Sequence, residues 1–128
     1  MSIDTDRMAL TTLAVLPAQE IERLPWTPVP ACPGVSEKTL WQFGDFVHAL
    51  VRYLPGASSP GRPHLAAHHH LWVVSGSCTL ARRRLGPGSY VHVPPGAEHG
   101  VRDVGEDGCV LLQLHRPHPP QEADLLGG

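Results

Sequence analysis

Hydrophobic and polar residues alternate along the middle of the chain with the two-residue period of β-strands. In residues 45–54, Val47, Ala49, Val51 and Tyr53 fall on one face, and that face is apolar. Other short apolar runs, bounded by glycine and proline, occupy residues 11–16, 38–43, 71–74, 78–81, 89–93, 101–104 and 109–115. Many short strands at this spacing are typical of a sandwich or barrel. The pattern therefore predicts an all-β fold.

Proline and glycine set the limits of the predicted domain. The 14 prolines and 13 glycines are spread along the whole length, which leaves little room for long helices. Prolines are dense before Val35 and return after residue 117. We therefore predict an extended proline-rich N-terminal arm at 1–34, a barrel at 35–117 and a flexible tail at 118–128.

Composition narrows the function classes. A chain of 128 residues with 41% hydrophobic residues and a net charge of −2 fits one globular domain with no electrostatic footprint for nucleic acid. No apolar run reaches the ~20 residues of a membrane span, and the N-terminus has no signal-peptide pattern. Cys32, Cys78 and Cys109 are odd in number and widely spaced, which argues against a disulfide framework. We expect a cytoplasmic protein that binds neither nucleic acid nor membrane.

Histidines are the chemically notable residues of the chain. Residues 46–97 contain no Asp or Glu. Six of the nine histidines lie between Gly56 and His99, namely His64, His68, His69, His70, His92 and His99. Neutral imidazole is a common ligand of zinc, iron, copper and nickel. If Leu71 faces the interior, alternation places His69 on the same side and its two histidine neighbours on the other. A metal site and a histidine-lined pocket without metal both fit this pattern.

One segment resembles the second sequence motif of the cupins. That motif reads Gly, five residues, Pro-x-Gly, two residues, His, and Gly88, Pro94, Gly96 and His99 match each fixed position. The resemblance covers roughly residues 26–116. It implies a cupin-type antiparallel β-barrel, also described as a double-stranded β-helix or RmlC-like jelly roll.

The first cupin motif is matched only in part. It ends at Gly76, which places His69 where the family has Glu and His64 at the second position of His-x-His. Arg62 occupies the position of the first His, and it cannot ligate because it stays protonated. The preceding run at 51–60, with Arg-Tyr-x-Pro-Gly, is similar to the ChrR-like and dihydroxyacetophenone dioxygenase-like single-domain cupins.

The resemblance implies a divalent transition metal on His64, His69 and His99. Iron is the first expectation, with zinc, nickel or manganese as alternatives, and His68 or His70 could replace His69 if the strand is bulged. Without a carboxylate ligand, the ion would keep its full +2 charge as a Lewis acid. Arg62 could bind an anionic substrate group, His92 could act as a further ligand or acid/base, and Tyr53 is a pocket candidate.

Three functions follow from this resemblance. The first is a metal-dependent oxidoreductase with dioxygenase-like oxidation of an enol or phenol. The second is a non-oxidative cyclase or isomerase similar to the polyketide cyclases of the cupin family. The third is a small-ligand or metal-sensing binding module, although residues 1–40 are too rich in proline for the zinc-binding helical half of an anti-sigma factor. We expect a small-molecule substrate and a homodimer formed through the N-terminal arm.

Overall fold

The computed structural model describes residues 13–61 and 67–117, and nearly all of the regular secondary structure within these ranges is β-strand. One short helix and eight strands follow one another along the sequence. They are α1 (Ala18–Arg23), β1 (Thr27–Pro28), β2 (Val35–Phe43), β3 (Phe46–Tyr53), β4 (Ala67–Gly76), β5 (Cys78–Leu80), β6 (Arg83–Leu85), β7 (Tyr90–Val93) and β8 (Cys109–Pro117). The predicted all-β fold is confirmed.

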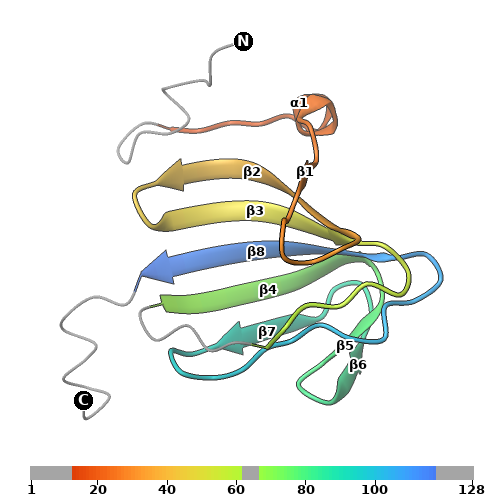
Figure 1. The fold of residues 1–128 in the computed structure, drawn as a ribbon. Coiled ribbons are helices and arrows are strands. Elements are labelled where there is room, and N and C mark those ends of the chain that lie inside the picture. The colour runs from red at the N-terminus through yellow and green to blue at the C-terminus, as the bar shows by residue number, and fades with distance from the viewer. Residues whose placement is uncertain (1–12, 62–66, 118–128) are drawn as a thin grey trace.

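The strands form one large curved sheet and one small hairpin (Figure 1). The large sheet has the order β1-β2-β3-β8-β4-β7 with antiparallel pairing throughout, and β5 pairs only with β6. Because β8 lies between β3 and β4, segments far apart in the sequence become neighbours. The last strand, β8, therefore pairs directly with the histidine-rich strand β4.

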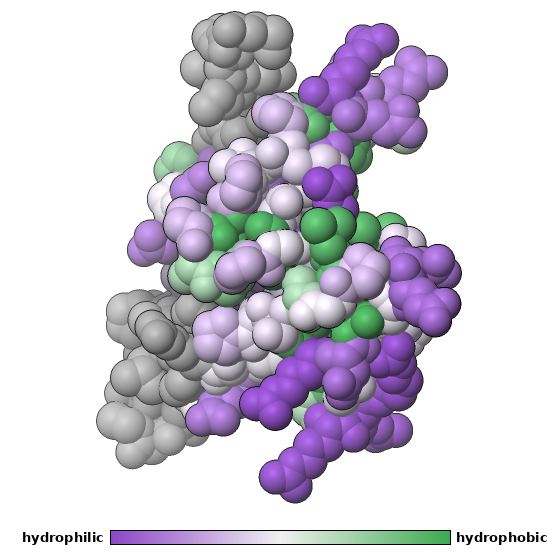
Figure 2. Space-filling model, turned by 45° about the vertical axis from the view of Figure 1, so that its right-hand side comes forward, coloured by the Kyte–Doolittle hydropathy of each residue, from purple (hydrophilic) through white to green (hydrophobic). Residues whose placement is uncertain are grey.

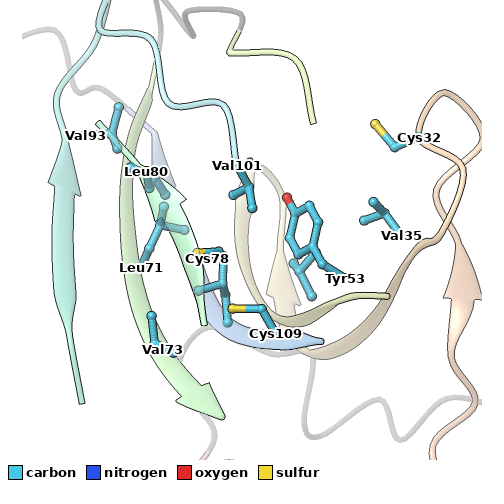
Figure 3. Close-up of a cluster of buried hydrophobic side chains, with 12 residues drawn as sticks. Cys32, Val35, Tyr53, Leu71, Val73, Cys78, Leu80, Val93, Val101 and Cys109 are labelled. Atoms are coloured by element: carbon cyan, nitrogen blue, oxygen red, sulfur yellow. The ribbon is translucent and has the colours of Figure 1, made fainter. Parts of the chain in front are cut away.

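The core lies on the concave side of the large sheet. Alternate residues of the central strands point inward, among them Val51, Tyr53, Leu71 and Leu111, and each is nearly inaccessible to solvent. Figure 3 shows these side chains gathered with those of the β5 hairpin and the neighbouring loops. Cys78 and Cys109 are free and buried within this cluster. Cys109 therefore packs as a small hydrophobic residue.

The N-terminal arm differs from the extended chain predicted for it. Residues 18–23 form a helix because Pro17 supplies a carbonyl that accepts from the backbone of Glu20 and Ile21, and the helix ends just before Pro25. The Nζ atom of the buried Lys38 donates to the Ile21 carbonyl at 2.9 Å, at the negative end of the helix. Residues 13–16 of the strand predicted at 11–16 lie outside any element, while 11 and 12 are outside the described ranges.

Trp26 anchors the arm to the outer surface of the barrel. The Lys38 ammonium lies 4.6 Å and the Arg52 guanidinium carbon 4.4 Å from the centre of the indole ring. Cation–π contacts contribute about 0.5–1 kcal/mol at exposed positions and about 2 kcal/mol when desolvated, and Lys38 is buried. Trp26 therefore packs against the barrel of its own chain.

The strand predicted at 101–104 is reduced to a single bridge. Thr79 and Arg102 exchange two backbone hydrogen bonds, but Asp103 then takes a left-handed conformation that ends the pairing. The apolar pattern there has another cause, since Val101 is 2% exposed and packs in the core from a loop.

On the face seen in Figure 2, apolar side chains gather across the middle and hydrophilic side chains lie around them. Arg82, in the tight turn between β5 and β6, and Arg83, the first residue of β6, are both exposed, which agrees with a solvated hairpin. Within the described ranges, no helix has the length and apolar character needed to cross a membrane.

Candidate functional site

A cavity of about 380 Å³ opens on the concave side of the large sheet. Strands β2, β3, β4 and β8 and three loops supply its walls, and most of the lining side chains are apolar. The polar ones are Glu37, Tyr53, Ser59, His69, His99, Gln113 and His115. An apolar cavity with a few convergent polar groups is the usual form of a small-molecule site.

Three imidazoles meet at one side of this cavity. His69 is 3% exposed and lies between the other two. Its Nδ1 atom is 2.9 Å from Nε2 of His99, and its Nε2 atom is 2.6 Å from Nδ1 of His115. The rings of His69 and His99 are inclined by 74°. Both nitrogens of His69 are thus engaged by another imidazole.

Local structure explains how these three residues come together. His69 and His115 are direct partners in the β4–β8 ladder, so their side chains emerge side by side on the concave face. His99 comes from the loop after β7. A side chain on Gly100 would press against the carbonyl oxygen of Ser59 and the backbone of Gly61, so glycine is required where this loop meets the 59–61 segment. This close approach brings His99 to the cavity.

The structure places two of the three predicted ligands together. His69 and His99 face one another inside the cavity, whereas His64 lies outside the described residues, as does Arg62. Tyr53 lines the cavity as predicted, and its hydroxyl shares a 3.1 Å hydrogen bond with Ser59 Oγ. Burial raises the pKa of Tyr53 above its ordinary value, so the residue stays a neutral phenol near pH 7.

His92 requires a correction, because it was expected in the pocket and lies on the convex side of the sheet. In β7 it is Val93 that points inward, which turns the imidazole of His92 toward solvent. There its Nε2 atom is 3.0 Å from Nδ1 of His68, and its ring stacks on that of His70. The same alternation places His68 and His70 outside the cavity. Of the three consecutive histidines, His69 is therefore the one that faces the cavity.

Four polar residues of the cavity were not among the predicted site residues. Glu37 enters from β2, Ser59 from the loop after β3, and Gln113 and His115 from β8. The sequence contained a signal for Gln113 and His115, because residues 109–115 were predicted as a strand. If Leu111 faces inward, alternation places both of these residues on the same face. The proximity of His115 to His69 depends on β8 inserting between β3 and β4, which no local pattern reveals.

The donor set fits a transition metal in chemistry but is incomplete in the described part of the chain. Zinc–imidazole bonds measure about 2.0–2.1 Å, so two ligands of one ion lie within about 4 Å of each other, as His69 Nδ1 and His99 Nε2 do at 2.9 Å. Within residues 13–61 and 67–117, no three His, Cys, Asp or Glu side chains are arranged to hold an ion. The predicted third ligand, His64, falls between these ranges.

A curved antiparallel sheet wrapped around an imidazole-lined cavity defines a jelly-roll barrel of the cupin class. Three glycines of its two sequence motifs, Gly76, Gly88 and Gly96, all take left-handed backbone conformations that disfavour other residues. A side chain on Gly76 would also collide with the backbone of Gly108. The family model of the ChrR cupin-like domain matches residues 17–119, and the chain belongs to this family.

Solved structures share the fold. KdgF from Halomonas sp. has 24% identity and a TM-score of 0.67, covering 79% of this chain and 94% of that one. The polyketide cyclase RemF from Streptomyces resistomycificus has 21% identity and a TM-score of 0.64, covering 82% and 81%. Rhodobacter sphaeroides SigE in complex with the anti-sigma ChrR has 20% identity and a TM-score of 0.64, covering 73% and 50%. At these identities the likeness shows the fold alone. No curated protein matches the chain.

Proposed function

We propose that this protein is a metal-dependent cupin enzyme that oxidises an enol or phenol in a dioxygenase-like reaction. The observation that supports it most is the pair formed by His69 Nδ1 and His99 Nε2, 2.9 Å apart on the wall of an apolar cavity. In a dioxygenase reaction both atoms of O2 enter the organic product, so no external reductant is required.

His64, His69 and His99 would hold the ion. All three are neutral imidazoles, so the bound ion would supply a Lewis acid of undiminished +2 charge and, if it is iron, a site at which O2 can react. His69 is deeply buried, which keeps water away from one side of the site. We expect iron first and treat zinc, nickel and manganese as alternatives.

The remaining cavity residues would bind and orient the substrate. A volume of about 380 Å³ lies within the range of small-molecule pockets, and apolar side chains such as Val35 and Leu111 fit an aromatic or alkyl body. The neutral phenol of Tyr53 can donate a hydrogen bond to a substrate oxygen, and Gln113 offers an amide. Arg62 is proposed to attract an anionic oxygen of the substrate from the adjoining segment.

A second candidate is a non-oxidative cyclase or isomerase that uses the same Lewis acid. The carboxylate of Glu37 favours it, because this group lines the cavity and could remove a proton next to a carbonyl. Such a reaction needs an acid/base and an ion but no O2. The two candidates therefore share a metal site and differ in their co-substrate.

Metal analysis of the purified protein tests the proposal. We expect about one transition-metal ion per chain in the wild type and loss of that ion in His64→Ala, His69→Ala and His99→Ala. His70→Ala is the matched control, since it is the next residue of the same strand and faces the opposite side. A wild-type protein that stays metal-free after incubation with iron, zinc, nickel and manganese would contradict the proposal.

Oxygen uptake then separates the two candidates. An iron-loaded protein that consumes O2 in proportion to an enolisable diketone or a phenolic ketone supports the dioxygenase reaction. Conversion of the same compounds under anaerobic conditions supports the cyclase or isomerase. Glu37→Gln should abolish only the second activity. The predicted homodimer is a separate proposal, which light scattering on the purified chain would test.

A further inference from the structure

We propose that Glu37 selects the substrate of the cavity, and that this substrate is a phenol or enol whose far end carries a protonated amine. The inference deepens the proposed function and rests on its phenolic or enolic substrate, but it requires no bound metal. Glu37 lines the cavity together with apolar side chains, a phenol, a hydroxyl, an amide and three imidazoles. Among the described lining residues it is the one carboxylate, and none of them is Lys or Arg.

The side chain of Glu37 lies on the concave face of the sheet. Its direct partner in β3 is Val51, which belongs to the buried core, and directly opposed residues of an antiparallel pair share one face. Val35, two residues earlier in β2, is also buried in the core. Inward positions of such a sheet are usually apolar, so a charged residue breaks the pattern here. Glu37 itself is exposed, which places its carboxylate where the cavity opens to solvent.

The Lys and Arg side chains next to Glu37 in β2 and β3 are turned away from the cavity. Lys38 points to the convex face, where its Nζ atom donates to two carbonyls of helix α1. The guanidinium of Arg52 lies on the same outer side, against the indole ring of Trp26. Neither of these two cations therefore neutralises Glu37 from inside the cavity, and a cation supplied by a ligand can approach the carboxylate there.

The register of the sheet separates Glu37 from the imidazoles. Glu37 is level with Leu111, because both oppose Val51. His115, which opposes His69, lies four residues further along β8. At about 3.3 Å per residue, this difference corresponds to roughly 13 Å along the sheet. A ligand that reaches both ends of the cavity must therefore be elongated, with one polar group at each end.

Charge and shape together define the class of ligand. A carboxylate forms its strongest hydrogen bonds with a charged donor such as an ammonium group, whereas it repels an anionic group. The apolar side chains between the two ends, Val51 and Leu111 among them, fit a ring with an alkyl arm. The imidazoles at the other end can donate to or accept from a phenolic or enolic oxygen. This combination describes a hydroxyaryl alkylamine. In the cyclase or isomerase candidate, by contrast, the same carboxylate would act as a base.

Three phenols of nearly equal size test the inference. Tyramine, tyrosol and 4-hydroxyphenylacetate share a phenol ring and end in an ammonium, a hydroxyl and a carboxylate. NMR titration in the presence of a chelator gives their affinities, and shifts of the side-chain amide of Gln113 show that they bind in the cavity. We expect the wild type to bind tyramine about three- to fivefold more tightly than tyrosol, the size expected of a solvent-exposed ion pair, and 4-hydroxyphenylacetate most weakly.

Substitutions of Glu37 provide the matched comparison. Glu37→Gln keeps the size of the side chain and removes its charge, so the ratio of the tyramine and tyrosol affinities should fall to about one. Glu37→Lys should make 4-hydroxyphenylacetate the preferred ligand. Glu106→Gln removes the same charge from an exposed turn outside the cavity, and it should keep the wild-type preference. Circular dichroism of each variant checks that the barrel is folded.

Separate outcomes overturn this inference and the metal function. Equal affinities for tyramine and tyrosol in the wild type, a preference that survives in Glu37→Gln, or failure of tyramine to bind in the cavity would each overturn the role of Glu37. Any of these results in a protein that takes up a transition metal would leave the metal function intact. A preference for tyramine that depends on Glu37, in a protein that takes up no metal, would support the role of Glu37 and overturn the metal function.

Discussion

The two faces of β4 carry the same residue type and have different environments. On the concave face, His69 is almost inaccessible to solvent and contacts two other histidines beside an apolar cavity. On the convex face, His70 contacts the hydroxyl of Tyr90 at 2.7 Å and stacks on His92 near solvent. Three consecutive histidines therefore form two separate groups, because successive side chains of a strand point to opposite sides.

The comparison shows that the environment of a histidine in this chain depends on the face of the sheet that it occupies. The inner group lies beside the cavity and away from solvent, and both ring nitrogens of His69 face another imidazole. In the outer group, one ring nitrogen of His68 faces one of His92 at 3.0 Å, close to solvent. Three predictions test how far this difference between the two faces extends.

The largest expected effect concerns two adjacent valines of β4. Val73 is 4% exposed and Val74 is 53% exposed. Val73→Ala should lower the free energy of unfolding by roughly 2 kcal/mol, since it removes two buried carbons and leaves a cavity. Val74→Ala should stay within about 0.5 kcal/mol of the wild type. Urea denaturation measures both, and similar losses in the two variants would mean that the convex face is buried in solution.

A tyrosine pair gives a smaller contrast. Tyr53 is 6% exposed and hydrogen-bonded to Ser59, whereas Tyr90 is 47% exposed and hydrogen-bonded to His70. Tyr53→Phe should cost about 1 kcal/mol, because it removes a buried hydrogen bond. Tyr90→Phe should change the free energy of unfolding by less than about 0.5 kcal/mol. Thermal and urea unfolding of both variants measures the two losses. A larger loss in Tyr90→Phe than in Tyr53→Phe would contradict the assignment of the two faces.

The smallest effect is a pH dependence on the outer face. Burial, followed by the charges of His92, Arg116 and His68, lowers the pKa of His70 from its ordinary value of 6.5. The folded protein then binds fewer protons than the unfolded chain, so the contribution of His70 to stability is complete above pH 6.5 and declines as pH falls below it.

Replacement of His70 by Gln should therefore weaken the loss of stability between about pH 7 and pH 5. Urea denaturation at several pH values measures this difference, and NMR titration of the wild type gives the pKa of His70 directly. A pKa above 6.5 would reverse the expected sign.

The sequence was informative wherever a property depends on local pattern. Alternation in residues 45–54 predicted strand β3, and the glycines of the cupin motifs marked turns that need left-handed backbone. The interior position of His69 also follows from alternation, given an inward Leu71. Each of these conclusions requires only neighbours along the chain.

Features that depend on strand order could not be predicted in the same way. His115 meets His69 because β8 lies beside β4, a pairing of residues 46 positions apart. The apolar run at 101–104 looks like a strand, yet Val101 is buried from a loop and Asp103 ends the pairing. His92 was predicted in the pocket because it is a histidine close to His99. In β7, however, Val93 points inward, so His92 lies on the other face.

The arm before β2 also contributes to the barrel interior, which bears on where the functional unit begins. Val29 and Cys32 line the cavity beside Tyr53, although they precede the first long strand. Their side chains are constrained by whatever occupies the cavity, just as those of the strands are. Substitutions in this short segment should therefore alter ligand selectivity, and a barrel cut at residue 34 would have an open wall. The wall of the cavity is thus completed by residues that precede the first long strand.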